Sequence, residues 1–166
     1  MNRRPRADRR GRASPAAGFR MREARVADVE GLARLATQLG YPTTAEQAAR
    51  RATEVLGRPG HRVLVAEVGG DVVGWIHVAP NVTLESDRAG EIAGLVVDEA
   101  FRGLGIGARL IDEAERWAAD QGYGRMRVRS NVKRNRAKRF YERAGYAVTK
   151  RQRNFEKRLE GSVSQG

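Results

Sequence analysis

The stretch from Glu91 to Ala119 constrains the fold of this chain more than any other. It begins with a β-branched apolar run, Ile92 to Val97, which has the composition of a buried strand. It ends in an amphipathic helical pattern, and a glycine-rich turn, residues 102–107 (RGLGIG), separates the two. A helix N-terminus presents unpaired N–H groups and a partial positive charge, so this order of elements predicts a phosphate site.

The spacing of residues in the turn narrows the choice of phosphate-containing ligand. A nucleotide-binding P-loop needs Lys-Ser or Lys-Thr after its last glycine, whereas Ala108-Arg109 follows here. A dinucleotide-binding turn needs G-x-G-x-x-G, whereas the spacing here is G-x-G-x-G. The alternative is a tight turn that uses glycine for geometry only. Alternate glycines beside Arg102 favour a bound phosphate.

Arg102, Gly105 and Gly107 resemble the acetyl-coenzyme-A loop of the GCN5-related N-acetyltransferases (GNAT), whose pattern is Gln/Arg-x-x-Gly-x-Gly/Ala. The resemblance implies that the loop binds the pyrophosphate, and that the preceding strand pairs with the pantetheine arm as another strand would. It also places a backbone amide near Val97 at the oxyanion. The cofactor-binding residues implied are Leu95, Val96, Val97, Arg102, Gly103, Leu104, Gly105, Ile106, Gly107 and Ala108.

A second signature lies within residues 131–146 and resembles the family pattern Asn-x-x-Ala-x-x-Phe-Tyr-x-x-x-Gly-Phe/Tyr. It is matched by Asn135, Phe140, Tyr141, Gly145 and Tyr146, and by Ala137 displaced by one position. In the family the asparagine steadies the cofactor's arm and the tyrosine lies beside its sulfur. A phenol titrates near ~10 and a thiol near ~8.5, so Tyr141 is expected to protonate the departing thiolate. The alternative is an ordinary packing aromatic.

Glu91 is the candidate base. It is expected to open the central strand, and it precedes Arg102 by the offset of the catalytic glutamate in the histone-modifying branch of the family. An alkylammonium with a pKa near ~10.4 must lose a proton before it can attack a thioester. A carboxylate takes that proton directly or through a water. A strand-end glutamate facing solvent is an equally supported alternative.

The remaining polar candidates are less specific. A basic cluster fits four roles: binding the cofactor's 3′-phosphate, binding an anionic substrate, binding RNA, or forming a solvated helix face. Its members are Lys133, Arg134, Arg136, Lys138 and Arg139. Lys138 is assigned to the cofactor. His61 and His77 are expected to be lone strand histidines without partners at metal spacing, so no metal site is predicted. Trp75 is either a core residue or part of the acceptor site.

The pattern predicts one domain, residues 19–160, between a disordered Arg-rich tail (1–18) and a flexible C-terminus (161–166). Strands are expected at 19–22, 62–68, 72–78, 92–97 and 125–131, with one or two more in 146–159. Helices are expected at 29–39, at 45–56 with a capping box of Thr44 and Gln47, at 106–119, and at 135–144 with Gly145 as an αL cap. Residues 80–90, which have turn composition and the acids Glu85 and Asp87, are expected to form a mobile loop. This α+β order is that of the GNAT fold: a mixed, mostly antiparallel sheet of six to seven strands, about four helices, and strands 4 and 5 splayed for the cofactor.

Composition limits the class of protein. The chain has no cysteine, no apolar run of membrane-spanning length and no signal-peptide pattern, so a cytoplasmic protein is expected. The net charge is −6 over residues 26–124 and +12 over residues 125–158. A generic nucleic-acid binder would be basic throughout, so nucleic acid is not an expected partner. A membrane is not expected either, because the sequence has no apolar run of spanning length. A homodimer is left open.

We therefore expect an acetyl-coenzyme-A-dependent N-acetyltransferase in which a small-molecule primary amine attacks directly in a ternary complex. Residues 130–134 (SNVKR) and the segment E-I-x-x-L-V-V from Glu91 look most like the aminoalkylphosphonate acetyltransferases. Aminoglycosides and a protein N-terminus are the alternative acceptors. The non-enzyme alternative is a basic nucleic-acid-associated binding protein that uses the Arg tail and the basic helix.

Overall fold

The structure is a computed structural model that describes residues 18–131 and 133–159, and these form two compact units divided after Asn131. Of the five strands and four α-helices formed by the described residues, the first unit contains every strand and three helices, and the second contains the last helix. Residues 1–17 of the tail predicted at 1–18, and the flexible end predicted at 161–166, lie outside the described residues.

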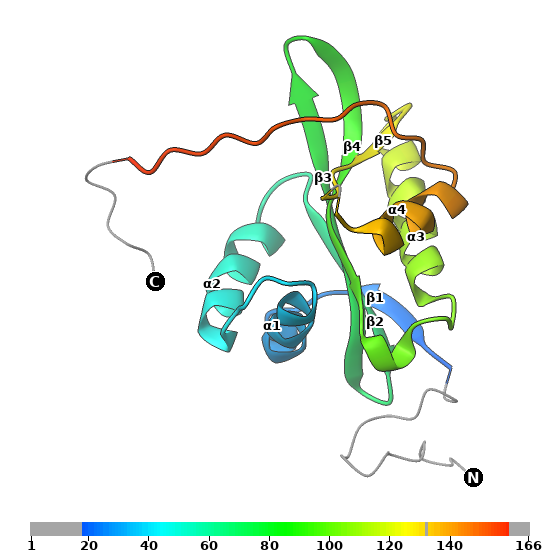
Figure 1. Cartoon of the computed structure of the whole chain (residues 1–166). Helices are drawn as coiled ribbons and strands as arrows, with labels where there is room; N and C mark the ends of the chain where they lie inside the picture. The colour runs from blue at the N-terminus through cyan, green and yellow to red at the C-terminus, as the bar shows by residue number, and fades with distance from the viewer. Residues whose placement is uncertain (1–17, 132, 160–166) are drawn as a thin grey trace. The chain divides into compact units, whose positions relative to one another are not determined.

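The first unit is built on one twisted sheet (Figure 1). Its strands lie in the order β1-β2-β3-β4-β5; β1 to β4 are antiparallel neighbours, and β5 runs parallel to β4. A mixed, mostly antiparallel sheet was expected and is confirmed. The strands are β1 (Arg20–Glu23), β2 (Arg62–Val68), β3 (Asp71–Thr83), β4 (Ser86–Val97) and β5 (Met126–Val128).

Helices cover the two faces of this sheet (Figure 1). Helices α1 (Val29–Gln38) and α2 (Ala45–Leu56) pack on one face, which we call the α1 face, and α3 (Ile106–Asp120) packs on the other, the α3 face. Two 3-10 turns, η1 (Val26–Asp28) and η2 (Glu99–Phe101), precede α1 and the glycine turn. The capping box expected at the start of α2 is present, because Thr44 accepts from the Gln47 amide and Gln47 accepts from the Thr44 amide.

The second unit contains α4 (Asn135–Arg143), which ends as expected at Gly145 with a left-handed φ of 88°. The prediction of one or two strands in 146–159 is wrong, because these residues form no strand. Apolar side chains are sparse there: Val148, Phe155 and Leu159 are exposed, and a run of cations separates them. The sheet therefore has five strands, not the predicted six to seven.

The prediction of a mobile loop at 80–90 is also wrong, because β3 and β4 continue through it as one long hairpin. The turn composition suggested a break, but Pro80 lies beyond the point where the β2 partner of β3 ends, at the pairing of Arg62 with Val78. Beyond that point β4 is the only strand of the described residues that pairs with β3, and an edge strand tolerates a residue that lacks an N–H. Conversely, β5 is shorter than the predicted 125–131. No helix of the described residues is long and apolar enough to span a membrane.

A buried ion pair fixes the end of β4. Asp98 is only 2% exposed and accepts from the guanidinium of Arg34 on α1. The same guanidinium donates to the Val72 carbonyl at 2.7 Å, and the other oxygen of Asp98 accepts from the Ala100 amide at 3.1 Å. These contacts join α1, β3 and η2 immediately before the glycine turn.

Replacing Arg34 with Met should lower the free energy of unfolding by about 3 kcal/mol, because the Asp98 carboxylate would stay buried without its guanidinium. Urea denaturation measures the change. Arg116→Met is the matched control, because its ion pair with Glu113 lies at the surface and should contribute less than about 1 kcal/mol. Equal losses in the two variants would contradict the assigned role of the Arg34–Asp98 pair.

Candidate functional site

The candidate site begins where β4 separates from β5. The two strands pair only over Gly90↔Met126, Glu91↔Arg127 and Ile92↔Val128. On the other side of β4, Val78 lies opposite Ile92 and His77 opposite Gly94, so Ala93 is the extra residue of a β-bulge. A bulge bends and twists its strand. From Ala93 to Val97, no strand in the described part of the chain pairs with β4 on its β5 side.

This free edge contains the three strand residues predicted to bind the cofactor. Val96 is buried and packs in the core of the α1 face, whereas Leu95 and Val97 are half-buried. Because these side chains are buried or half-buried, the groups that the free edge can present to a ligand are its backbone N–H and C=O groups. An extended ligand arm can pair with such an edge by main-chain hydrogen bonds.

The glycine turn follows directly and leads into α3. Gly105 is the N-cap of α3 with a φ of 79°, and Gly103 has a φ of 78°, left-handed values that favour glycine. No side chain caps α3, and its first turn carries no acid. A Cβ at Gly103 or Gly105 would meet no atom within 4 Å, so the approach to the free amides is open. The turn therefore fits a pyrophosphate.

Side chains around the turn have separate tasks. Ile106 is buried in the core, so it offers the ligand only its backbone, and Leu104 is 44% exposed. Arg102 donates from Nε to the Val97 carbonyl at 3.3 Å and pairs through Nη1 with Glu99 at 3.4 Å. These contacts tie the turn to the end of β4 and leave the guanidinium half-buried beside it.

Glu91 lies on the α1 face and is held by two donors. Its carboxylate accepts from Asn81 Nδ2 and from Arg129 Nε at 2.8 Å, and its side chain is only 15% exposed. The alternative of a solvent-facing glutamate at the strand end is therefore wrong, since Glu91 is also in the middle of β4. Asn81 and Arg129 were not predicted, because only the register of β3, β4 and β5 brings them to Glu91.

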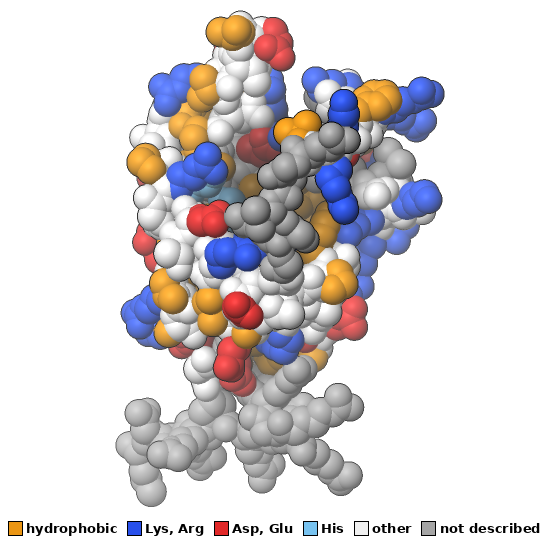
Figure 2. Space-filling model, turned by 90° about the vertical axis from the view of Figure 1, so that its left-hand side faces the viewer, with side chains coloured by type: hydrophobic (Ala, Val, Ile, Leu, Met, Phe, Trp, Pro, Cys, Tyr) orange, Lys and Arg blue, Asp and Glu red, His pale blue; other side chains and the backbone are white. Residues whose placement is uncertain are grey.

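The expectation of two lone histidines is wrong, because His61 Nδ1 and His77 Nε2 are 3.0 Å apart in a hydrogen bond. His77 lies on the same face as Asn81 and Glu91, since residues 77, 79 and 81 alternate along β3. Figure 2, which views the side on which α1 and α2 lie, shows histidine at the surface. Burial, with a smaller effect of the His61 charge, lowers the pKa of His77 to about 4. Burial and then Arg58 lower the pKa of His61.

Trp75 belongs to both the core and the site. It packs against the core of the α1 face, and its ring covers Gly94, where an added Cβ would lie 2.7 Å from the ring. Its Nε1 is buried and has no hydrogen-bond partner among the described residues. Those residues contain no group of three His, Cys, Asp or Glu side chains that could hold a metal ion.

The other predicted site residues belong to the second unit. Asn135 begins α4, and Lys138 pairs with Glu142 at 3.0 Å. The Tyr141 ring contacts Phe140 and Tyr146 edge-on, with centroids 5.2 and 5.8 Å apart. Burial raises the pKa of Tyr141 to about 12, against a smaller opposing effect of Arg134. Tyr141 therefore keeps its proton throughout the neutral range.

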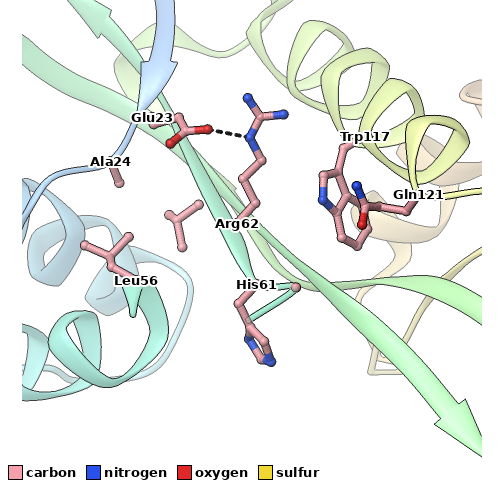
Figure 3. Close-up of a pocket in the computed structure, with 9 residues that line it drawn as sticks. Glu23, Ala24, Leu56, His61, Arg62, Trp117 and Gln121 are labelled. Atoms are coloured by element: carbon pink, nitrogen blue, oxygen red, sulfur yellow. Dashed lines mark hydrogen bonds and ion pairs between the residues drawn. The ribbon is translucent and has the colours of Figure 1, made fainter. Parts of the chain in front are cut away.

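A cavity of about 300 Å³ lies away from this site, at the start of β2 (Figure 3). Trp117 of α3 and Gln121, which follows α3, line one side. The side chains of His61, just before β2, and Arg62, its first residue, point in different directions. Arg62 pairs with Glu23 at 2.8 Å. Two strands, β3 and β4, separate this cavity from β5, so it is not where the glycine turn would place a cofactor.

Comparison with known proteins identifies relatives of this fold and sequence. Residues 27–146 match the Acetyltransferase (GNAT) family. An uncharacterized N-acetyltransferase of Archaeoglobus fulgidus is 35% identical over 89 residues, which cover 52% of this chain and 60% of that protein. The aminoalkylphosphonate N-acetyltransferase of Salmonella typhimurium is 40% identical over 78 residues, which cover 46% of this chain and 51% of that protein. The chain thus spans little more than half the length of these relatives.

Among solved structures, the aminoglycoside N-acetyltransferase AAC(6′)-Iy in complex with coenzyme A superposes with a TM-score of 0.77. The superposition covers 87% of this chain and 97% of that chain at 18% identity. At this identity the likeness concerns the fold alone.

The histidine pair makes a prediction about acid stability. The pKa of His77 falls from 6.5 to about 4 on folding. Between about pH 4 and pH 6.5, His77 is therefore protonated in the unfolded chain and neutral in the folded chain. Stability is therefore lost as pH falls below about 6.5, by about 2 kcal/mol between pH 7 and pH 5. Urea denaturation of wild type and His77→Gln at both pH values measures this loss. A wild-type loss no larger than that of the variant would contradict the assignment.

Proposed function

The chain belongs to the Acetyltransferase (GNAT) family, and from this we propose that it transfers the acetyl group of acetyl-coenzyme A to a primary amine of a small molecule. The observation that carries the proposal is the free edge of β4 running directly into the uncapped glycine turn of α3. One element offers main-chain pairing to an extended arm, and the next offers free amides to a pyrophosphate.

The residues proposed to hold the cofactor follow from that arrangement. The backbone of Leu95, Val96 and Val97 pairs with the pantetheine arm, and the amides of 103–108 receive the pyrophosphate. Arg102 keeps the turn against β4. Asn135 and Lys138 are proposed from the family pattern, although Lys138 must then exchange its ion pair with Glu142.

Acetyl-coenzyme A supplies an acetyl group activated as a thioester. The chain's own task at the acceptor is to remove a proton, because an alkylammonium with a pKa near ~10.4 has no free electron pair. Glu91 is proposed to take that proton, directly or through a water. Its two donors, Asn81 and Arg129, fix the carboxylate in one orientation on the α1 face. A carboxylate that is already fixed in position needs little reorganisation when it accepts the proton.

The leaving thiolate needs a proton, and Tyr141 is proposed to donate it. Its pKa of about 12 is further above that of a thiol, near ~8.5, than an ordinary phenol would be. Transfer is thus less favourable than for an exposed tyrosine, but the group is fully protonated at neutral pH. The backbone amide near Val97 is proposed to stabilise the oxyanion.

Substitution of Gly107 tests cofactor binding without disturbing the fold. Gly107 lies in the first turn of α3 without the left-handed φ of Gly105, so Gly107→Val should not lower stability. The added side chain should obstruct the free amides and weaken acetyl-coenzyme-A binding at least about tenfold, measured by calorimetry. Ala119→Val, on an exposed position of the same helix, is the control. Unchanged affinity in a folded Gly107→Val protein would refute the turn assignment.

A pH–rate profile separates the two proton transfers. Glu91→Gln should slow turnover on the order of a hundredfold at neutral pH and recover as pH rises, because free amine becomes abundant. Tyr141→Phe should slow turnover by a similar factor at every pH up to about 11, because the pKa of Tyr141 is about 12.

Two substitutions serve as controls for that profile: Glu85→Gln at the exposed end of the same hairpin, and Tyr146→Phe beside Tyr141. Turnover of both should stay within about threefold of wild type, far from the hundredfold scale of a lost acid or base. A pH-independent defect in Glu91→Gln would mean that Glu91 positions the amine instead. Near wild-type turnover in Tyr141→Phe would remove the acid role.

A further inference from the structure

Three arginines lie at alternate positions in and beside β5: Arg127 within the strand, and Arg125 and Arg129 one residue outside its two ends. They lie on the α1 face, because Met126 between them packs with Trp117 and Ala118 of α3 near Gly90. Their ion pairs support this placement: Arg125 pairs with Asp87 at 2.9 Å, and Arg129 pairs with Glu91, which is on the α1 face, at 2.8 Å. Both outer arginines are therefore neutralised by carboxylates of β4.

The middle arginine differs from its neighbours. Arg127 is half-buried and donates from Nη1 to the Ser86 hydroxyl at 3.4 Å, a long bond to a neutral group. Within residues 18–131 and 133–159, no carboxylate lies within ion-pair distance of Arg127. A partly desolvated guanidinium beside two paired ones has its donors available for an external anion.

A second polar atom on the same face also lacks a partner. Asn81 donates from Nδ2 to Glu91, which fixes the orientation of its amide, and its Oδ1 is buried with no donor in the described part of the chain. A buried carbonyl oxygen without a donor is costly, so this position suits a ligand N–H. Asn81 Oδ1 and the Glu91 carboxylate together suit an ammonium or amine.

These two features are close to each other. Glu91 and Arg127 are register partners on adjacent strands, which are about 5 Å apart. Arg127 extends from this position toward Ser86, so its guanidinium lies nearer the hairpin tip than the Glu91 carboxylate does. A ligand that touches both must carry an amine and an anion separated by a short spacer.

Resting on the proposed function, we infer that the acceptor is a short zwitterion whose ammonium is held by Asn81 and Glu91 and whose phosphonate is held by Arg127. A guanidinium binds phosphonate and carboxylate by the same paired hydrogen bonds. Aminoglycosides carry several cations and no anion, so Arg127 disfavours them as acceptors.

Binding at equilibrium tests the inference without requiring turnover. Calorimetry with the full chain in the presence of coenzyme A compares 2-aminoethylphosphonate with ethanolamine, which replaces the anion by a hydroxyl. Arg127→Gln should weaken 2-aminoethylphosphonate at least about tenfold and change ethanolamine less than twofold, since only the former loses a charge-assisted bond. Arg127→Lys should restore part of the loss. Arg125→Gln, whose arginine is already paired with Asp87, should bind both as wild type does.

Further ligands identify the source of the anion. Binding of β-alanine as tight as that of 2-aminoethylphosphonate would support the site and assign it to carboxylates as well. An affinity for 2-aminoethylphosphonate that stays within twofold in Arg127→Gln would overturn the inference. Equal or tighter binding of ethanolamine or kanamycin by wild type would also overturn it.

Failure of the proposed function can be distinguished from failure of the zwitterion inference. If 2-aminoethylphosphonate binds through Arg127 but acetyl-coenzyme A releases no thiol with it or with any amine, the acceptor site stands and the transferase proposal falls. If thiol release is normal for uncharged amines and independent of Arg127, the transferase proposal stands and the zwitterion inference falls.

Discussion

The separation of β4 from β5 is the constraint on which the rest of the candidate site depends. Backbone N–H and C=O groups inside a sheet are nearly always paired, because leaving them unpaired and buried is costly. The bulge at Ala93 turns β4 out of register with β3, and pairing with β5 stops at Ile92. The chain thereby keeps a strand edge next to the free amides of α3. The Arg34–Asp98 ion pair and the Arg102–Val97 bond then fix the joint between edge and turn.

The boundary between β4 and β5 also separates an acidic part of the chain from a basic part. Residues 26–124 carry −6 and residues 125–158 carry +12, and β5 brings the first arginines of the basic part against the carboxylates of β4. Among the residues that the structure describes, Arg125 and Arg129 pair with these carboxylates and Arg127 does not, and the Arg129 pair holds Glu91 in one orientation. The histidine pair and Trp75 continue this face across β3, with both imidazoles kept neutral at pH 7 by burial. The part of the α1 face around Glu91 is therefore polar and fixed, whereas its part beneath α1 is packed core.

The sequence was most informative where the determinants are local. The strand, glycine turn and helix at 92–119, the capping box of Thr44 and Gln47, and the αL glycine at 145 each depend on neighbouring residues and were predicted correctly. The hairpin at 80–90 was missed because its turn composition and its acids are typical of a loop, while its pairing depends on where β2 ends. The contacts of Glu91 with Asn81 and Arg129, and of His61 with His77, arise from strand register, which local composition does not encode.

Amide hydrogen exchange with and without saturating acetyl-coenzyme A tests the central claim that the free edge and the turn receive the cofactor. The account predicts slower exchange in the presence of the cofactor for backbone amides between Ala93 and Val97 and for those of residues 103–108. Amides of β2, which is separated from β5 by the two strands β3 and β4, should be unchanged. Cofactor binding that protects the cavity at His61 and Arg62 while leaving 93–97 and 103–108 unaffected would contradict the account.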